Sequence, residues 1–113
     1  MSQEIRVAAV DDIDEGDAIT VDAKTAGTPD DIAIFHSGGG GFYALDDTCT
    51  HETASLADGW IEGKEVECPV HAAKFCLLTG KALCLPATRA VRTHRVEVRD
   101  GAVWLTPNLA VDA

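Results

Sequence analysis

Two short stretches of this sequence place a cysteine close to a histidine. Cys49 and His51 have one residue between them, Cys68 and His71 have two, and sixteen residues separate His51 from Cys68. Thiolate sulfur and imidazole nitrogen are donors that hold iron or zinc in proteins. Each stretch follows a strand-like segment, so each can present one thiolate and one imidazole from a tight loop. The spacing therefore predicts one metal centre held between two loops.

Two kinds of metal centre fit two cysteines and two histidines. One is a tetrahedral zinc site. The other is a two-iron cluster in which each loop gives its cysteine to one iron and its histidine to the other. Zinc fingers usually group cysteine with cysteine and histidine with histidine, whereas this chain alternates them. The alternation favours the iron cluster, and a zinc-stabilised interaction module stays as an alternative.

The pattern Cys-x-His, sixteen residues, Cys-x-x-His is the ligand signature of Rieske proteins. Beyond the ligands, the sequence resembles the ferredoxin components of multicomponent aromatic-ring-hydroxylating dioxygenase systems, over essentially the whole chain. The matching stretches are residues 49–52, 57–60, 67–71, 78–83 and 85–87, together with Phe75.

The resemblance implies one Rieske-type [2Fe–2S] cluster with Cys49, His51, Cys68 and His71 as its metal ligands. It implies a soluble, low-potential ferredoxin that carries single electrons and is not itself an enzyme, with no catalytic residues. In aromatic hydrocarbon catabolism the electrons come from a flavin-containing NAD(P)H reductase and go to a terminal oxygenase. The alternative within the family is the Rieske small subunit of a nitrite reductase-like oxidoreductase.

Respiratory Rieske proteins resemble this chain only in the ligand loops. They carry an extra cysteine in each loop and join the two by a disulfide, and the corresponding positions here are Ala54 and Val70. They also place a serine and a tyrosine hydroxyl against the cluster sulfurs, where this chain has Ala73 and Phe75. The comparison implies a low reduction potential, because neither hydroxyl is present.

Short β-prone stretches separated by turns predict an all-β fold. The glycine-rich residues 37–41 are expected to form a hairpin tip, and Asp100-Gly101 a second hairpin turn. We expect a single domain over residues 1–113, a Rieske-type antiparallel β-sandwich or small barrel, with cluster-binding loops at about 46–60 and 66–76 at one tip. A short helical turn is expected near residues 53–57. The expected strands are Ile5–Val10, Ala18–Val21, Asp31–Phe35, Phe42–Leu45, Lys74–Leu77, Ala82–Leu85, Thr93–Val98 and Ala102–Leu105.

The chain has 113 residues and a net charge of −10. This charge makes nucleic acid and anionic membranes poor partners. The apolar stretches are too short to span a membrane, and the N-terminus lacks the pattern of a secretory signal. We therefore expect a cytoplasmic protein, and we expect it to be a monomer.

Five further residues are of types that often carry chemistry. His36 and His94 are interpreted as structural histidines without a metal role. Cys76 and Cys84 flank a turn, and we interpret them as buried thiols, with extra ligands or a disulfide as the alternatives. Trp60 is expected to pack over the first ligand loop.

Overall fold

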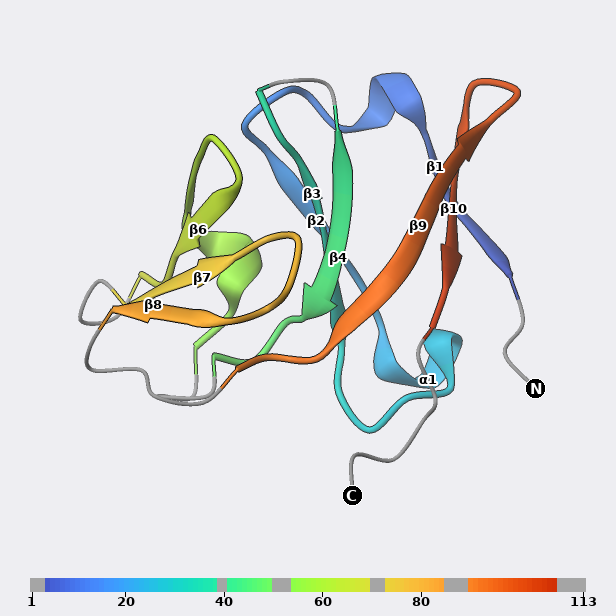
Figure 1. Cartoon of the computed structure of the whole chain (residues 1–113). Coiled ribbons are helices and arrows are strands. Elements are labelled where there is room, and N and C mark those ends of the chain that lie inside the picture. Colours follow the sequence, from blue (N-terminus) through green and yellow to red (C-terminus); the bar gives the residue numbers. More distant parts are fainter. Residues whose placement is uncertain (1–3, 39–40, 50–53, 70–72, 85–89, 108–113) are drawn as a thin grey trace.

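Two antiparallel sheets make up the protein. The computed structural model describes residues 4–38, 41–49, 54–69, 73–84 and 90–107. The larger sheet has six strands in the order β1-β10-β9-β4-β3-β2, and the smaller has four in the order β5-β6-β7-β8. Figure 1 shows the smaller sheet as a separate layer beside the larger one. The predicted all-β antiparallel fold is confirmed.

The elements are short. The strands of the larger sheet are β1 (Ile5–Ala9), β2 (Ala18–Val21), β3 (Ile32–His36), β4 (Phe42–Asp46), β9 (Thr93–Arg99) and β10 (Ala102–Thr106). Those of the smaller sheet are β5 (Trp60–Glu62), β6 (Glu65–Glu67), β7 (Lys74–Cys76) and β8 (Ala82–Cys84). The helical turns are η1 (Val10–Asp12), α1 (Ala23–Ala26) and η2 (Leu56–Asp58). In the described part of the chain, no helix is long and apolar enough to cross a membrane.

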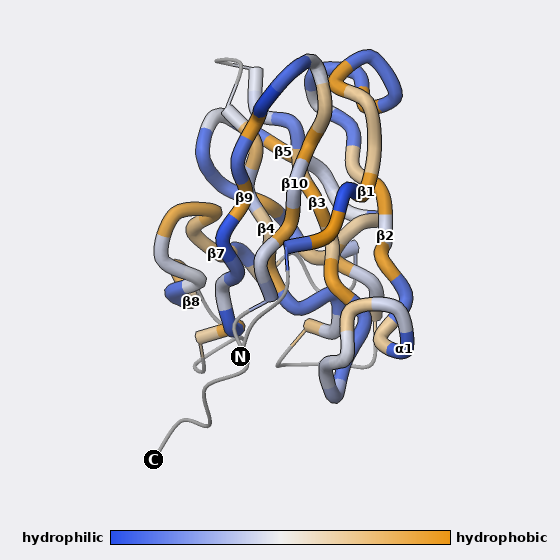
Figure 2. Tube along the Cα trace, turned by 90° about the vertical axis from the view of Figure 1, so that its right-hand side faces the viewer, coloured by the Kyte–Doolittle hydropathy of each residue, from blue (hydrophilic) through white to orange (hydrophobic). Residues whose placement is uncertain are grey.

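Strand β3 is buried on both faces. Residues 32–35 are all apolar and have no exposed surface, as expected for a strand covered on both sides; Figure 2 colours the strand as hydrophobic. Ile32 and Ile34 pack in a cluster with Val103 and Leu105 of β10. Ala33 and Phe35 face the other way, into a cluster shared with the smaller sheet. Strand β3 therefore contributes side chains to both clusters of buried residues.

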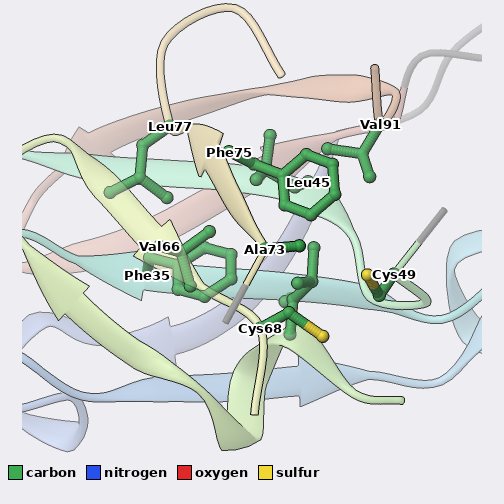
Figure 3. Close-up of a cluster of buried hydrophobic side chains, with 11 residues drawn as sticks. Phe35, Leu45, Cys49, Val66, Cys68, Ala73, Phe75, Leu77 and Val91 are labelled. Carbon is green, nitrogen blue, oxygen red and sulfur yellow. The ribbon is translucent and has the colours of Figure 1, made fainter. Parts of the chain in front are cut away.

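The second cluster holds the smaller sheet against the larger one. Phe35 and Leu45 of the larger sheet pack in it with Val66 and Phe75 of the smaller sheet and with Leu77, which follows β7 (Figure 3). All five are buried, at 0–2% exposure. Because burial of each large apolar side chain contributes about 1.5–3 kcal/mol, this cluster fixes the position of the smaller sheet.

Backbone contacts reinforce this attachment at Gly80. Its carbonyl accepts a hydrogen bond from the N–H of Val91, at 2.8 Å. A Cβ at this position would lie 2.1 Å from the carbonyl oxygen of Val91, and φ is +75°. Only glycine fits both the conformation and the close approach.

The β9–β10 hairpin has the predicted turn. Arg99 pairs with Ala102, and Asp100 and Gly101 both have positive φ, 53° and 75°. Two residues of positive φ define the turn type that asparagine or aspartate followed by glycine favours.

Candidate metal centre

Cys49 and Cys68 both come shortly after a strand, as predicted. Cys49 lies three residues beyond the end of β4, and Cys68 follows the last residue of β6 directly. Both side chains are buried, at 3% and 0% exposure, and neither is in a disulfide. Both belong to the cluster between the sheets, and Figure 3 shows their sulfur atoms at the same edge of it. The structure therefore brings together two thiols from different loops.

The two loops are closed by the same kind of hydrogen bond. The N–H of Cys49 donates to the carbonyl of Ala54 at 3.0 Å, and the N–H of Cys68 donates to the carbonyl of Ala73 at 2.6 Å. In both cases the acceptor lies five residues after the cysteine. The predicted ligands His51 and His71 fall within these two spans and lie outside the described residues, as does Val70. The matching bonds give the two cysteines equivalent positions at the base of their loops.

Asp47 organises the base of the first loop. Its Oδ1 accepts hydrogen bonds from the Ser55 hydroxyl at 2.8 Å and from the N–H of Ala57 at 3.0 Å. Its own carbonyl accepts from the N–H of Leu56 at 2.7 Å. Burial raises the pKa of the Asp47 carboxyl, the two hydrogen bonds oppose this rise, and Asp30 adds to it. This one side chain connects the start of the loop to its end.

Asp30 also holds this loop in place. Its carboxylate accepts hydrogen bonds from the Thr48 hydroxyl at 2.8 Å and from the Thr48 N–H at 3.0 Å. Thr48 also forms an isolated bridge with Ser55. The residue immediately before Cys49 is therefore fixed at both its backbone and its side chain.

Replacement of Asp47 tests this arrangement. Asp47→Ala should lower the free energy of unfolding by about 1–3 kcal/mol, because the Ser55 hydroxyl and the Ala57 N–H lose a buried acceptor. Asp47→Asn should be tolerated, because an amide oxygen can replace Oδ1 and the buried charge disappears. Urea unfolding of the purified protein measures both, with the exposed Asp11→Ala as control. If both variants lost the same free energy of unfolding, the carboxylate charge, and not the hydrogen-bond acceptor, would be what stabilises the loop.

The other two histidines have structural partners. His36 is stacked on Phe42 with the ring centroids 4.1 Å apart, and its Nδ1 lies 2.7 Å from the carbonyl oxygen of Ile13. His94 is buried, and its Nε2 lies 2.7 Å from a carboxylate oxygen of Asp46. Both contacts agree with the interpretation that these histidines are structural.

Two expectations about neighbouring residues are wrong. Trp60 is 62% exposed, which contradicts its expected role as a packed side chain. It lies on the face of β5 that points away from the core. Cys76 is a half-buried thiol and not a buried one. A hydrogen bond with Thr79 lowers the pKa of the Cys76 thiol. Of Cys84, only its place at the end of β8 is described.

The sequence matches a known domain family. The profile of the Rieske [2Fe-2S] domain matches residues 3–95. The chain belongs to this family. The Rieske-type [2Fe–2S] cluster predicted from the sequence is therefore the cofactor, and the donor chemistry of two buried thiols at the base of two matching loops fits it.

The relatives of this Rieske chain are ferredoxins. It is 48% identical over 107 residues to the 3-phenylpropionate/cinnamic acid dioxygenase ferredoxin subunit of Photorhabdus laumondii, which covers 94% of this chain and 95% of that one. The subunit of the same name from Escherichia coli K12 is 46% identical over 102 residues, covering 89% and 91%. A solved complex of reduced oxygenase and oxidized ferredoxin in carbazole 1,9a-dioxygenase contains a chain of the same fold, with a TM-score of 0.83, 33% identity and coverage of 95% and 97%. The predicted resemblance to dioxygenase ferredoxins is confirmed.

Proposed function

We propose that this protein is the Rieske ferredoxin of an aromatic-ring-hydroxylating dioxygenase system. In this role it receives single electrons from a flavin-containing NAD(P)H reductase and delivers them to the terminal oxygenase. The observation that carries the proposal is the identity of 46–48% to dioxygenase ferredoxin subunits over nearly the full length of both chains. The role is electron transfer and not catalysis, as in those subunits.

The proposed ligands are Cys49 and Cys68 through sulfur, and His51 and His71 through a ring nitrogen. The buried thiols and the two matching loop closures support the cysteine assignments. When bound, a [2Fe–2S] cluster with two histidine ligands takes up and releases one electron at a higher potential than an all-cysteine cluster. The chain buries both sulfurs away from water. Solvent access is one of the main factors that set the reduction potential of such a centre.

The described residues offer no second metal site for oxygen chemistry. Non-haem iron oxygenases use two histidines and one carboxylate with open positions. Of the described residues, no group of three or more histidine, cysteine, aspartate or glutamate side chains could hold a metal ion. His36 and His94 have the structural contacts given above.

The proposed cellular location follows from the electron donor, the reductase. We place the protein in the cytoplasm, because the proposed reductase draws on NADH or NADPH. The net charge of −10 suits a carrier that meets its partners by diffusion, since complementary charge raises association rates.

Reconstitution of electron transfer tests the proposed function. The protein is combined with the purified reductase and oxygenase of the Escherichia coli 3-phenylpropionate/cinnamic acid dioxygenase, NADH and 3-phenylpropionate. We expect product formation and oxygen consumption that depend on this ferredoxin. Omission of the ferredoxin is the negative control, and the E. coli ferredoxin subunit is the positive one. If the holoprotein is neither reduced by the reductase nor oxidised by the oxygenase, the proposal is wrong.

A further inference from the structure

The smaller sheet presents one face to solvent. The strands pair so that Ile61, Val66 and Phe75 lie in one row and point into the core. Because side chains alternate along a strand, the flanking positions point outward. They form two rows across the sheet, which we call the outer face: Trp60, Glu67 and Lys74 in one row, and Glu62, Glu65 and Cys76 in the other.

Trp60 is the apolar centre of the outer face. Its side chain is 62% exposed, and it borders an open hollow of about 380 Å³ that Glu62, Glu65, Glu67 and Lys74 also line. Among the described residues, three of the four exposed large hydrophobic side chains (Trp60, Leu78 and Leu83) lie between residues 60 and 84, in the part of the chain that forms the smaller sheet. Exposed apolar groups concentrated on one part of a surface mark interaction sites. Tryptophan is also the residue type most enriched among those that dominate binding energy.

The charges of the outer face are unbalanced. Glu62 lies directly opposite Glu65, and like charges directly opposite each other destabilise a sheet. Lys74 is the one cation among the six residues of the face. A partner that brings positive side chains would relieve this repulsion. An arginine fits best, because its guanidinium can stack on an indole and pair with a carboxylate at the same time.

The outer face adjoins the metal centre. Glu67 ends β6 and is followed directly by Cys68, whose buried thiol lies at the base of the second loop. Trp60 is paired with Glu67 across the sheet. A protein seated on this face therefore contacts the strand that leads into the second ligand loop.

We propose that the outer face is the docking surface for the oxygenase, which contributes an arginine-rich or lysine-rich patch around Trp60. This inference rests on the proposed function, which supplies the oxygenase as electron acceptor. A complex between an oxygenase and a ferredoxin of this fold has been solved, and on this ground we assign the outer face to the oxygenase.

Two variants of the holoprotein test the surface. The first is Trp60→Ala, and the second changes Glu62, Glu65 and Glu67 together to glutamine. The probe is the oxygenase of the E. coli 3-phenylpropionate/cinnamic acid dioxygenase, with the dissociation constant measured by calorimetry at several salt concentrations. Trp60→Ala should weaken binding at least about tenfold, and the triple variant at least about threefold. The triple variant should also show a weaker dependence on salt, because three screened charges are gone.

Matched controls separate local docking from general acidity. Asp11→Asn, Asp14→Asn and Glu15→Gln together remove the same number of exposed negative charges from the segment that joins β1 and β2. Val98→Ala removes an exposed apolar side chain, 47% exposed, from β9. Both controls should bind within about twofold of the wild type. Absorption spectra of all variants confirm that the cluster is intact.

The thiol of Cys76 provides an independent readout on the same face. It is partly exposed, and its lowered pKa favours the reactive thiolate. Bound oxygenase should slow its alkylation by iodoacetamide. Trypsin cleavage separates residues 75–81 from residues 82–89, so mass spectrometry distinguishes Cys76 from Cys84.

The outcomes are distinct. Weaker binding of both outer-face variants, with the controls unchanged and Cys76 protected, supports the docking surface. If the wild type binds and the outer-face variants bind equally well, the docking surface is wrong and the proposed function stands. If the variants slow only reduction by the reductase, the choice of the oxygenase is wrong. If the wild type neither binds the oxygenase nor reduces it, the proposed function itself fails.

Discussion

Alanine at Cys49, His51, Cys68 or His71 is expected to abolish the cluster or damage it severely, while alanine at Cys76 leaves it intact. Each of the four is a proposed iron ligand that would supply one donor atom, and no spare donor is expected to replace it. The wild type should contain about two irons and two acid-labile sulfides per chain, the content of a [2Fe–2S] centre. Metal analysis and the visible spectrum measure both. Zinc in place of iron would support the alternative interaction module.

The controls for this prediction come from the structure. Cys76→Ala tests a thiol on the outer face of the smaller sheet. His36→Ala and His94→Gln test the structural histidines, and glutamine at position 94 keeps a polar group near Asp46, which lies 2.7 Å from the His94 ring. Circular dichroism shows whether each variant folds. If a folded His94 variant lacked the cluster and His71→Ala retained it, the ligand assignment would be wrong.

The sequence was most informative where residue type and spacing decide the structure directly. The Asp100-Gly101 turn and the apolar residues 32–35 of β3 are signals of this kind, and the four-ligand pattern stays a prediction. The strands β5 and β6 were not predicted, because three residues are too few for a pattern and Glu62, Glu65 and Glu67 have low β-propensity. They form strands because Ile61 and Val66 pack toward Phe75, a contact made only in the folded chain.

The errors at Trp60 and Cys76 have the same origin. Tryptophan and cysteine are usually buried, so residue type alone predicts a buried side chain. Their exposure depends instead on the face of the sheet that they occupy. Phe75 is fully buried, and its neighbour Cys76 must therefore point outward. The loop contacts of Asp30 and Asp47 were also missed, because a hydrogen bond between Thr48 and Asp30 joins positions eighteen residues apart.

The reduction potential is expected to lie near the bottom of the Rieske range, which spans about −150 to +300 mV. Ala73 and Phe75, which stand where respiratory Rieske proteins have serine and tyrosine, are fully buried in the same cluster as Cys49 and Cys68. Neither has a hydroxyl that could donate to a cluster sulfur. Hydrogen bonds to charged acceptors contribute roughly 1.5–3 kcal/mol, and a tenfold change in equilibrium is about 59 mV for one electron. The two missing donors are therefore expected to lower the potential by about 130–260 mV.

Phe75→Tyr tests this explanation within one protein. A hydroxyl added to the buried ring should raise the potential by roughly 65–130 mV, the equivalent of one hydrogen bond to a charged acceptor. Protein-film voltammetry measures both the wild type and the variant. Leu77→Met, a substitution in the same buried cluster without a donor hydrogen, is the matched control and should leave the potential nearly unchanged. A wild-type midpoint above about +100 mV would contradict the low-potential assignment, and with it the role as electron donor to an oxygenase. A wild type of low potential with no shift in Phe75→Tyr would instead show that the ring is not directed at the cluster, because a hydroxyl acts on the potential only where it can donate to a sulfur.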